Sequence, residues 1–114
     1  MVEKSRNLSA YQQSMILEVA ILKIKPEIAA KFEAAFATAS LIISSMPGYI
    51  SHELQRCLEV ENQYVLLVRW AKLEDHTIGF RQSPEYQKWC QMLQHFYEPF
   101  PTVEHYTMVL SNEV

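Results

Sequence analysis

Two histidines on predicted strands are the first candidates for acid–base chemistry. His52 shares its side of one strand with two aliphatic residues, and His105 shares its side of the last strand with valines. Imidazole gains and loses protons near neutral pH, so either ring could hold or remove a substrate proton. The competing interpretation is a histidine that is hydrogen-bonded within the core or at a subunit interface. We therefore take His52 and His105 as candidate catalytic residues, with packing as the favoured alternative.

Aromatic side chains gather in and around one stretch, RWAKLEDHTIGFRQSPEYQKW. Aromatic walls are common in sites for flat ligands. The candidates for lining a substrate pocket are Trp70, Phe80, Tyr86, Trp89 and Arg69. Core packing between helix and sheet is the favoured role for Trp89, whereas Trp70 and Tyr86 suit the pocket and the core about equally.

Two other polar residues in this stretch favour structural interpretations. Arg69 interrupts an apolar strand, and a buried charge needs a partner. An ion pair with Glu18 or Glu53, within one chain or across a dimer, is favoured over binding of a substrate carboxylate. His76 follows two acidic residues at a predicted helix start, so we expect it to be exposed to solvent, or at most to belong to a lid.

Hydrophobic patterning predicts four strands that position these side chains. The first segment is rich in branched aliphatic residues, and the second alternates between apolar and polar residues, as strands do. An acidic turn joins the second segment to the third in a hairpin. The predicted strands are residues 15–24, 49–58, 63–71 and 102–110.

Apolar residues at spacings of three and four predict two amphipathic helices. The first begins at Pro26, where a missing N–H costs nothing, and ends at Met46-Pro47-Gly48, where glycine is free to take positive φ. The second begins at Ser83-Pro84-Glu85, which supplies a hydroxyl cap, a proline in the first turn and a carboxylate near the helix dipole. Residues 73–80 predict a short helix between them, weakened by Gly79.

The order strand, helix, strand, strand, helix, strand predicts an α+β domain: a four-stranded antiparallel sheet with both helices on one face. We expect residues 1–14 to form a flexible arm, 15–110 the domain and 111–114 a tail. The strand at 63–71 is apolar on both sides, and the helices cover only one. Exposed apolar area is costly, so we expect a homodimer packed through the open sheet faces rather than a monomer.

Composition excludes several classes of partner. The net charge is −3 and the basic residues are scattered singly, which argues against nucleic acid or an anionic membrane surface. Cys57 and Cys90 have neither disulfide-framework nor zinc-site spacing and suit a reducing cytoplasm. Residues 1–14 have no signal-peptide pattern, and no run reaches the roughly 18 apolar residues of a membrane span. We expect a soluble cytoplasmic protein.

Several segments resemble the antibiotic biosynthesis monooxygenase family over about Met15 to Val109. They are MPGYISHEL, VRW with the LEDH that follows it, SPEYQKW and PTVEHYTMV. The resemblance implies a ferredoxin-like βαββαβ domain that forms a dimeric α/β barrel. It also implies a monooxygenase that needs no metal or bound flavin, because an electron-rich aromatic or quinol-like substrate itself activates oxygen. The alternative is a dimeric module that binds a small hydrophobic or aromatic ligand without catalysis.

The haem-degrading branch of the family provides a sharper comparison. Its members are implied to carry a Trp on the short helix and an iron-ligating His on the following helix. This chain has Phe80 and Cys90 at those positions. A cysteine can ligate haem, but a cysteine on an apolar helix stripe more often packs in the core. Haem binding or degradation is therefore the least favoured of the three functions.

Overall fold

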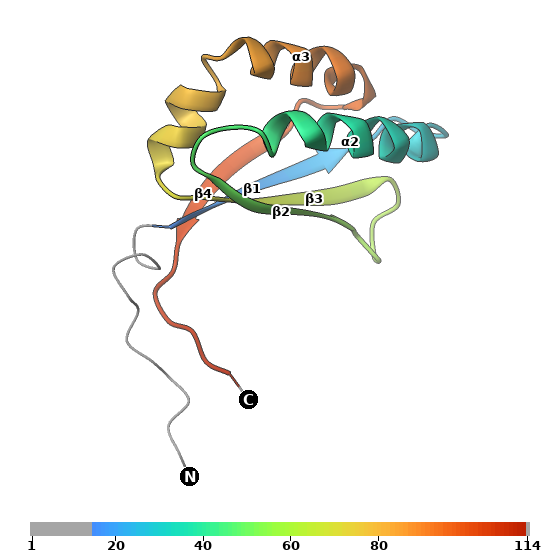
Figure 1. Ribbon diagram of the computed structural model, residues 1–114. Coiled ribbons are helices and arrows are strands. Elements are labelled where there is room, and N and C mark those ends of the chain that lie inside the picture. The colour runs from blue at the N-terminus through green and yellow to red at the C-terminus, as the bar shows by residue number, and fades with distance from the viewer. Residues whose placement is uncertain (1–14, 114) are drawn as a thin grey trace.

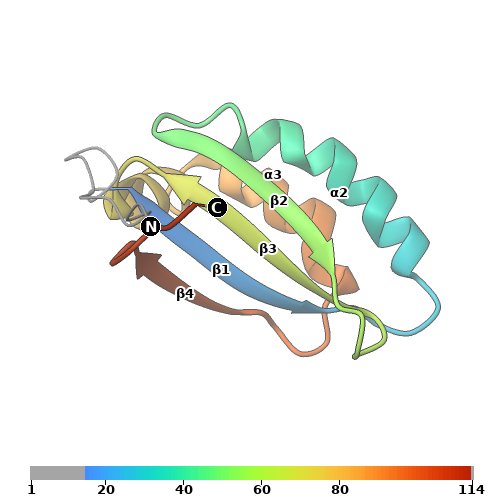
Figure 2. The ribbon, with the colours of Figure 1, turned by 90° about the horizontal axis from the view of Figure 1, so that it is seen from below.

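The computed structural model describes residues 15–113 as a four-stranded antiparallel sheet with the helices on one face (Figure 1). The strand order is β2-β3-β1-β4, so the first strand in the chain lies in the interior of the sheet (Figure 2). The strands are β1 (Ile16–Lys23), β2 (Tyr49–Arg56), β3 (Gln63–Trp70) and β4 (Thr102–Thr107). The predicted α+β, ferredoxin-like fold is confirmed, although β4 ends before the expected Leu110. The arm expected at residues 1–14 lies outside the described residues.

Two α-helices and two short helical turns lie above the sheet in Figure 1. They are α2 (Ala29–Ile43), the π-helical turn η1 (Asp75–Phe80), α3 (Pro84–Leu93) and the 3-10 turn η2 (Gln94–Phe96). Helix α2 begins three residues later than expected from Pro26, because Glu27 adopts a left-handed backbone with φ of 71°. A residue in that conformation cannot belong to a right-handed helix.

The start signal of α3 and the positive φ expected at Gly48 are confirmed, whereas α2 ends at Ile43, before the expected Met46. The Ser83 hydroxyl accepts a hydrogen bond from the backbone N–H of Tyr86 at 3.1 Å, which fixes the start of α3. Gly48, after α2, has a φ of +83°, and a Cβ there would overlap the Asp75 carboxylate. Ser83 therefore fixes the end of the connection between β3 and α3, and Gly48 packs closely against Asp75 in that connection.

The hydrophobic core fills the space between the helices and one sheet face. Alternate residues of each strand point into it, as the pleat requires. Its largest fully buried side chains are Trp70, Phe32, Phe80, Leu22, Ile43, Leu93 and Val68. No helix of residues 15–113 lies on the opposite sheet face (Figure 1). None of the helices within residues 15–113 has the length and apolar content of a membrane-crossing segment.

Candidate active site

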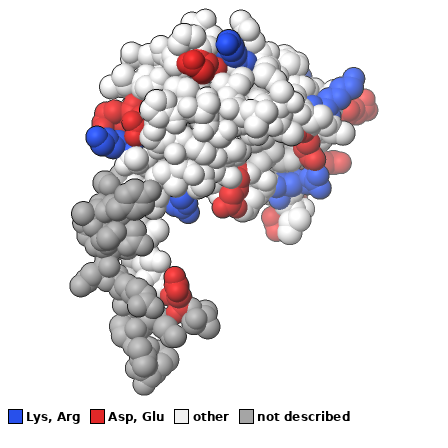
Figure 3. Space-filling model, viewed as in Figure 1, with Lys and Arg blue, Asp and Glu red and all other residues white. Residues whose placement is uncertain are grey.

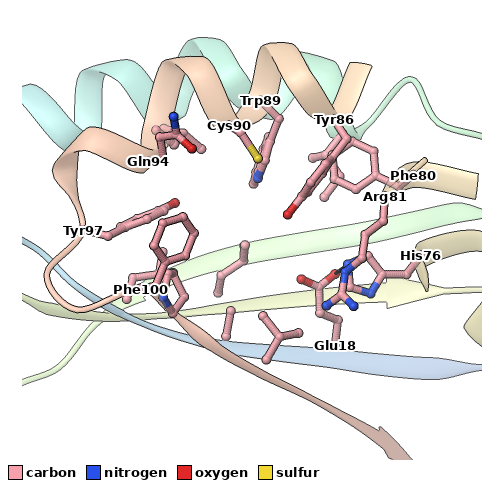
Figure 4. A pocket seen from close by; sticks show the side chains of 17 residues that line it. Glu18, His76, Phe80, Arg81, Tyr86, Trp89, Cys90, Gln94, Tyr97 and Phe100 are labelled. Atoms are coloured by element: carbon pink, nitrogen blue, oxygen red, sulfur yellow. Dashed lines mark ion pairs between the residues drawn. The ribbon is translucent and has the colours of Figure 1, made fainter. Parts of the chain in front are cut away.

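A cavity of about 90 Å³ lies between the helix-covered face of the sheet and α3. One end is polar, where Glu18, His76 and Arg81 come together (Figure 4). The remaining wall is mostly aromatic and aliphatic, and it includes Phe80, Tyr86, Trp89, Tyr97 and Phe100. A small apolar cavity with a few convergent polar groups is the usual form of a small-molecule site.

Glu18 is the buried acid of this site. It belongs to the set of β1 residues that point toward the helices, and only 5% of its surface is exposed. The indole Nε1–H of Trp70 donates a hydrogen bond to Glu18 Oε1 at 2.9 Å. Burial raises the pKa of Glu18, while the Trp70 hydrogen bond and the Arg81 charge oppose that rise. The carboxyl group is thus shifted toward the pKa range in which it can exchange protons near neutral pH.

His76 joins Glu18 to a second histidine. Its Nε2 lies 3.3 Å from Glu18 Oε1, and its Nδ1 lies 2.8 Å from His105 Nε2. The ring stacks on Trp70 with centroids 5.5 Å apart. Burial lowers the pKa of His76 to about 3, and the positive charge of Arg81 and the neighbouring His105 act in the same direction. The His76 ring is therefore neutral at neutral pH, and its contact with Glu18 is not an ion pair.

The expected exposure of His76 is wrong. Only 3% of its surface is exposed, because the π-helical turn η1 directs the ring down toward the sheet. No capping or periodic signal in the sequence marks this π-helical turn.

Three titratable groups now form a continuous path, which we name the Glu18–His76–His105 chain. Glu18 and His105 sit opposite each other on neighbouring strands β1 and β4, and His76 contacts both from above. Glu18 and His76 are buried, whereas His105 is half-buried on the edge strand β4. The chain therefore leads from the cavity to the edge of the sheet.

Three of the residues predicted to line a pocket, Phe80, Tyr86 and Trp89, line this cavity. Trp70 lies next to it and contributes through its hydrogen bond to Glu18. His105 reaches it through His76.

Two candidates lie elsewhere. His52 on β2 contacts the hydroxyl of Tyr49 at 2.5 Å and does not line the cavity. Arg69 points to the uncovered face, as does its β1 partner Leu17. The expected ion pair between Arg69 and Glu18 is wrong, because the two side chains lie on opposite faces of the sheet. Within residues 15–113 Arg69 forms no ion pair with Glu53 either.

Sequence reasoning missed the roles of Glu18, His76 and Arg81 at the cavity. For Glu18 a signal existed: it alternates in register with Ala20 and Leu22, which predicts that it shares their buried side of the strand. For Arg81 no periodic pattern was available, since it follows an irregular turn.

A second hollow, open to solvent, lies beside α2 and the β2–β3 connection. Two of its charged groups pair with each other, because Glu33 Oε2 accepts from Arg56 at 2.6 Å and also from the Tyr64 hydroxyl at 2.5 Å. This pairing lowers the pKa of Glu33, with the Tyr64 hydrogen bond as the main cause. The Glu33 carboxylate is therefore held in a paired, solvated arrangement and is not shifted toward proton exchange near neutral pH.

Among residues 15–113, no group of three or more His, Cys, Asp or Glu side chains is placed to hold a metal ion. Lysine, arginine and acidic side chains are interspersed over the face seen in Figure 3.

Comparison with known proteins identifies the family. The model of the antibiotic biosynthesis monooxygenase family matches residues 15–92. YczJ of Bacillus subtilis (strain 168), a protein without characterised function, is 54% identical over 92 residues, which make up 81% of this chain and 97% of YczJ. The chain belongs to the antibiotic biosynthesis monooxygenase family.

Solved structures agree with this assignment. A candidate antibiotic biosynthesis monooxygenase from Bordetella bronchiseptica is 32% identical, with a TM-score of 0.82, and the match covers 85% of this chain and 99% of that one. SnoaB from Streptomyces nogalater, a cofactor-independent oxygenase, shares the fold at 21% identity with a TM-score of 0.63, covering 89% of this chain and 96% of SnoaB.

Proposed function

We propose that the protein is a monooxygenase that oxidises a small hydroxyaromatic or quinol-like metabolite without a metal or a bound flavin. Family membership supports this proposal, as does the fold shared with a cofactor-independent oxygenase. The observation that carries it is the Glu18–His76–His105 chain, which places a buried carboxyl group and two imidazoles at the end of an aromatic cavity.

The first task of such an enzyme is to remove the phenolic proton. Glu18 is the proposed base, because its raised pKa lets its carboxylate accept a proton near neutral pH. As neutral His76 takes this proton at Nε2, it gives up the one on Nδ1 to His105 Nε2, so the ring carries no charge during the transfer. His105, at the sheet edge, releases a proton to water. Each group acts over a contact present in the structure.

Oxygen chemistry follows at the phenolate. The deprotonated ring gives one electron to dioxygen, and the resulting radical pair joins to form a carbon–oxygen bond at a ring position that carries hydrogen. The peroxide then loses water as the O–O and C–H bonds break, which leaves a quinone. One oxygen atom enters the product and the other leaves as water, so a phenol and one dioxygen give a quinone and one water. The protein's part is to position the ring, exclude solvent and move the proton.

Oxygen consumption tests this function. Single-ring phenols and hydroquinones with electron-donating substituents should support dioxygen uptake in chelator-treated buffer, with quinone formed in a one-to-one ratio to oxygen. No uptake across such a panel, by protein shown to be folded, would contradict the proposal.

The second candidate is a module that binds a small aromatic ligand without reaction. The hydrogen bond between Trp70 and Glu18 favours it, because a buried acid can be kept for structural specificity as well as for catalysis. This module would bind ring compounds with no oxygen uptake, and variants of Glu18 or His76 would change affinity alone. Haem has less support, because a macrocycle far larger than one benzene ring, which needs roughly 150 Å³, would lie almost wholly outside a cavity of about 90 Å³.

We further propose a homodimer built through the uncovered sheet faces, and a cytoplasmic location in which Cys57 and Cys90 remain free thiols. The uncovered face carries apolar side chains along the two central strands and one aromatic ring on the edge. These are Leu17, Val19, Ile21, Val65, Leu67 and Tyr106. Packing two such faces together removes apolar area from water at about 25 cal/mol per Å².

A further inference from the structure

Arg81 is a cation at the polar end of the cavity. It follows η1 directly, and its side chain lies beside Glu18 and His76 (Figure 4). Among residues 15–113 its guanidinium makes neither a hydrogen bond nor an ion pair with another side chain. Its charge nevertheless acts on Glu18, His76, His105 and Tyr86. The donors of this guanidinium are thus available to a ligand.

A guanidinium presents a planar set of N–H donors that suits an anionic oxygen. Arg81 is exposed on its outer side, so it avoids the cost of a fully buried charge. On its inner side it lies at the rim of a space that takes one ring. An aromatic ligand in the cavity would therefore meet a positive charge and an acid at the same end.

We propose that the cavity binds a single-ring phenol as its phenolate, with the phenolate oxygen held by Arg81 and the phenolic proton taken up by Glu18. This inference rests on the proposed function and deepens it, because it names the ionisation state and ring number of the ligand. It also assigns Arg81 as the residue that selects for an acidic hydroxyl.

Charge balance supports this assignment. Before binding, the Glu18 carboxylate offsets the Arg81 cation. When the phenol binds, Glu18 takes up the proton and the phenolate replaces it as the counter-charge of Arg81. Binding therefore adds no net charge to a poorly solvated site, before the proton leaves through His76. The other titratable groups that face this end do not disturb the balance, because they stay neutral near pH 7. They are His76 on η1, His105 on β4, Tyr86 on α3 and Tyr97 after η2.

Cavity size limits the ligand to one ring. The space of about 90 Å³ is below the roughly 150 Å³ of a cavity that encloses benzene, so one ring fills it with its outer edge in the mouth. Phe100, which is 72% exposed, lies among the lining residues and can contact substituents that project outward.

Binding of 4-nitrophenol under anaerobic conditions tests the inference. Its phenolate absorbs in the visible, and its nitro group withdraws electrons, so it is a poor reductant of oxygen. At a pH where the free compound is mostly protonated, we expect the bound compound to show the phenolate spectrum. The neutral isostere 4-nitroanisole should bind at least about tenfold more weakly, since it cannot form the charged hydrogen bond.

Variants assign the effect to Arg81. Arg81→Gln should weaken 4-nitrophenol binding by about tenfold or more and leave 4-nitroanisole binding nearly unchanged, whereas Arg81→Lys should retain part of the preference. Lys88→Gln, which removes an exposed positive charge from the outer side of α3, is the matched control and should bind as the parent does. Arg81 is exposed, so its variants are expected to fold, and a thermal unfolding scan checks this.

Three results would overturn the inference: no binding of 4-nitrophenol at millimolar concentration, binding in the neutral phenol form, or equal binding by the parent and Arg81→Gln. The proposed oxygenase function fails separately. Arg81-dependent phenolate binding without oxygen uptake from any electron-rich phenol would retain the ligand assignment and remove the reaction.

Discussion

At the scale of single residues, the site depends on a carboxyl group and an imidazole whose burial shifts their pKa values in ways that favour the neutral forms. Burial raises the pKa of Glu18 and lowers that of His76. Both groups therefore resist charge, and both lie within reach of a ligand in the cavity. Such paired shifts are common where proton transfer is required.

His76 should make the protein sensitive to mild acid. Its pKa is about 3 when folded and 6.5 in the reference state, so the unfolded chain binds the extra proton between these values. The free energy of unfolding therefore falls as the pH drops below 6.5. Glu18 has the opposite effect, because its raised pKa makes its contribution to stability smaller as the pH rises. The parent protein should lose at most about 2 kcal/mol more of its free energy of unfolding between about pH 6.5 and about pH 5 than a variant without the imidazole.

Urea unfolding of the parent and of His76→Gln at about pH 8 and about pH 5 measures this difference. Substitution of the exposed His95, which lies outside the chain of contacts, is the control and should leave the pH dependence as it is in the parent. Equal pH dependence in the parent and His76→Gln would show that His76 is not held in its neutral form.

The aromatic lining of the cavity could be predicted from the sequence, whereas the burial of His76 could not. Aromatic residues near the Ser83 cap were predicted to line a pocket, and Phe80, Tyr86 and Trp89 do line the cavity. The burial of His76 was not predictable, because it depends on a π-helical turn that no capping or periodic signal marks.

At the scale of elements, the segment from β3 to α3 positions most of the site. A local signal predicted its end well, because Ser83 caps α3 as expected. The positive φ expected at Gly48, between α2 and β2, is confirmed as well. Strand parity places Glu18 with Ala20 and Leu22 on the helix-covered face, whereas Arg69 and its partner Leu17 lie on the other, so the expected ion pair between Glu18 and Arg69 cannot form. Helix α2 starts late because Glu27 adopts a left-handed backbone conformation, which is uncommon for residues other than glycine and which the sequence does not signal.

The Ser83 cap should contribute measurably to stability. Ser83→Ala removes the acceptor for the Tyr86 N–H and should lower the free energy of unfolding by about 1 kcal/mol. Ser40→Ala within α2 is the matched control, since the Ser40 hydroxyl only bonds back to the Ala37 carbonyl and alanine favours helix. Chemical denaturation of both variants gives the comparison, and equal destabilisation would mean that the cap has no special role.

At the scale of the whole molecule, the one-sided placement of the helices leaves the other sheet face to be covered. A protein of 13.3 kDa with this face should sediment as a dimer at micromolar concentration. Leu67→Glu, in the middle of the uncovered face, should shift the mass to that of the monomer, because it would bury a carboxylate at the interface.

The control is Leu41→Glu on the outer side of α2, where leucine is 71% exposed and should be replaceable without change in mass. A monomeric parent protein, or a Leu67→Glu variant that remains dimeric, would contradict the proposed interface.

Oxygen uptake by Glu18→Gln tests the central claim most directly. Glutamine keeps an acceptor for the Trp70 N–H and the shape of the side chain, but it cannot take a proton. With the best phenol found for the parent protein, the rate of uptake at neutral pH should fall about a hundredfold or more, as expected for loss of a general base. A folded Glu18→Gln protein that consumes oxygen at the parental rate would contradict the role assigned to the Glu18–His76–His105 chain.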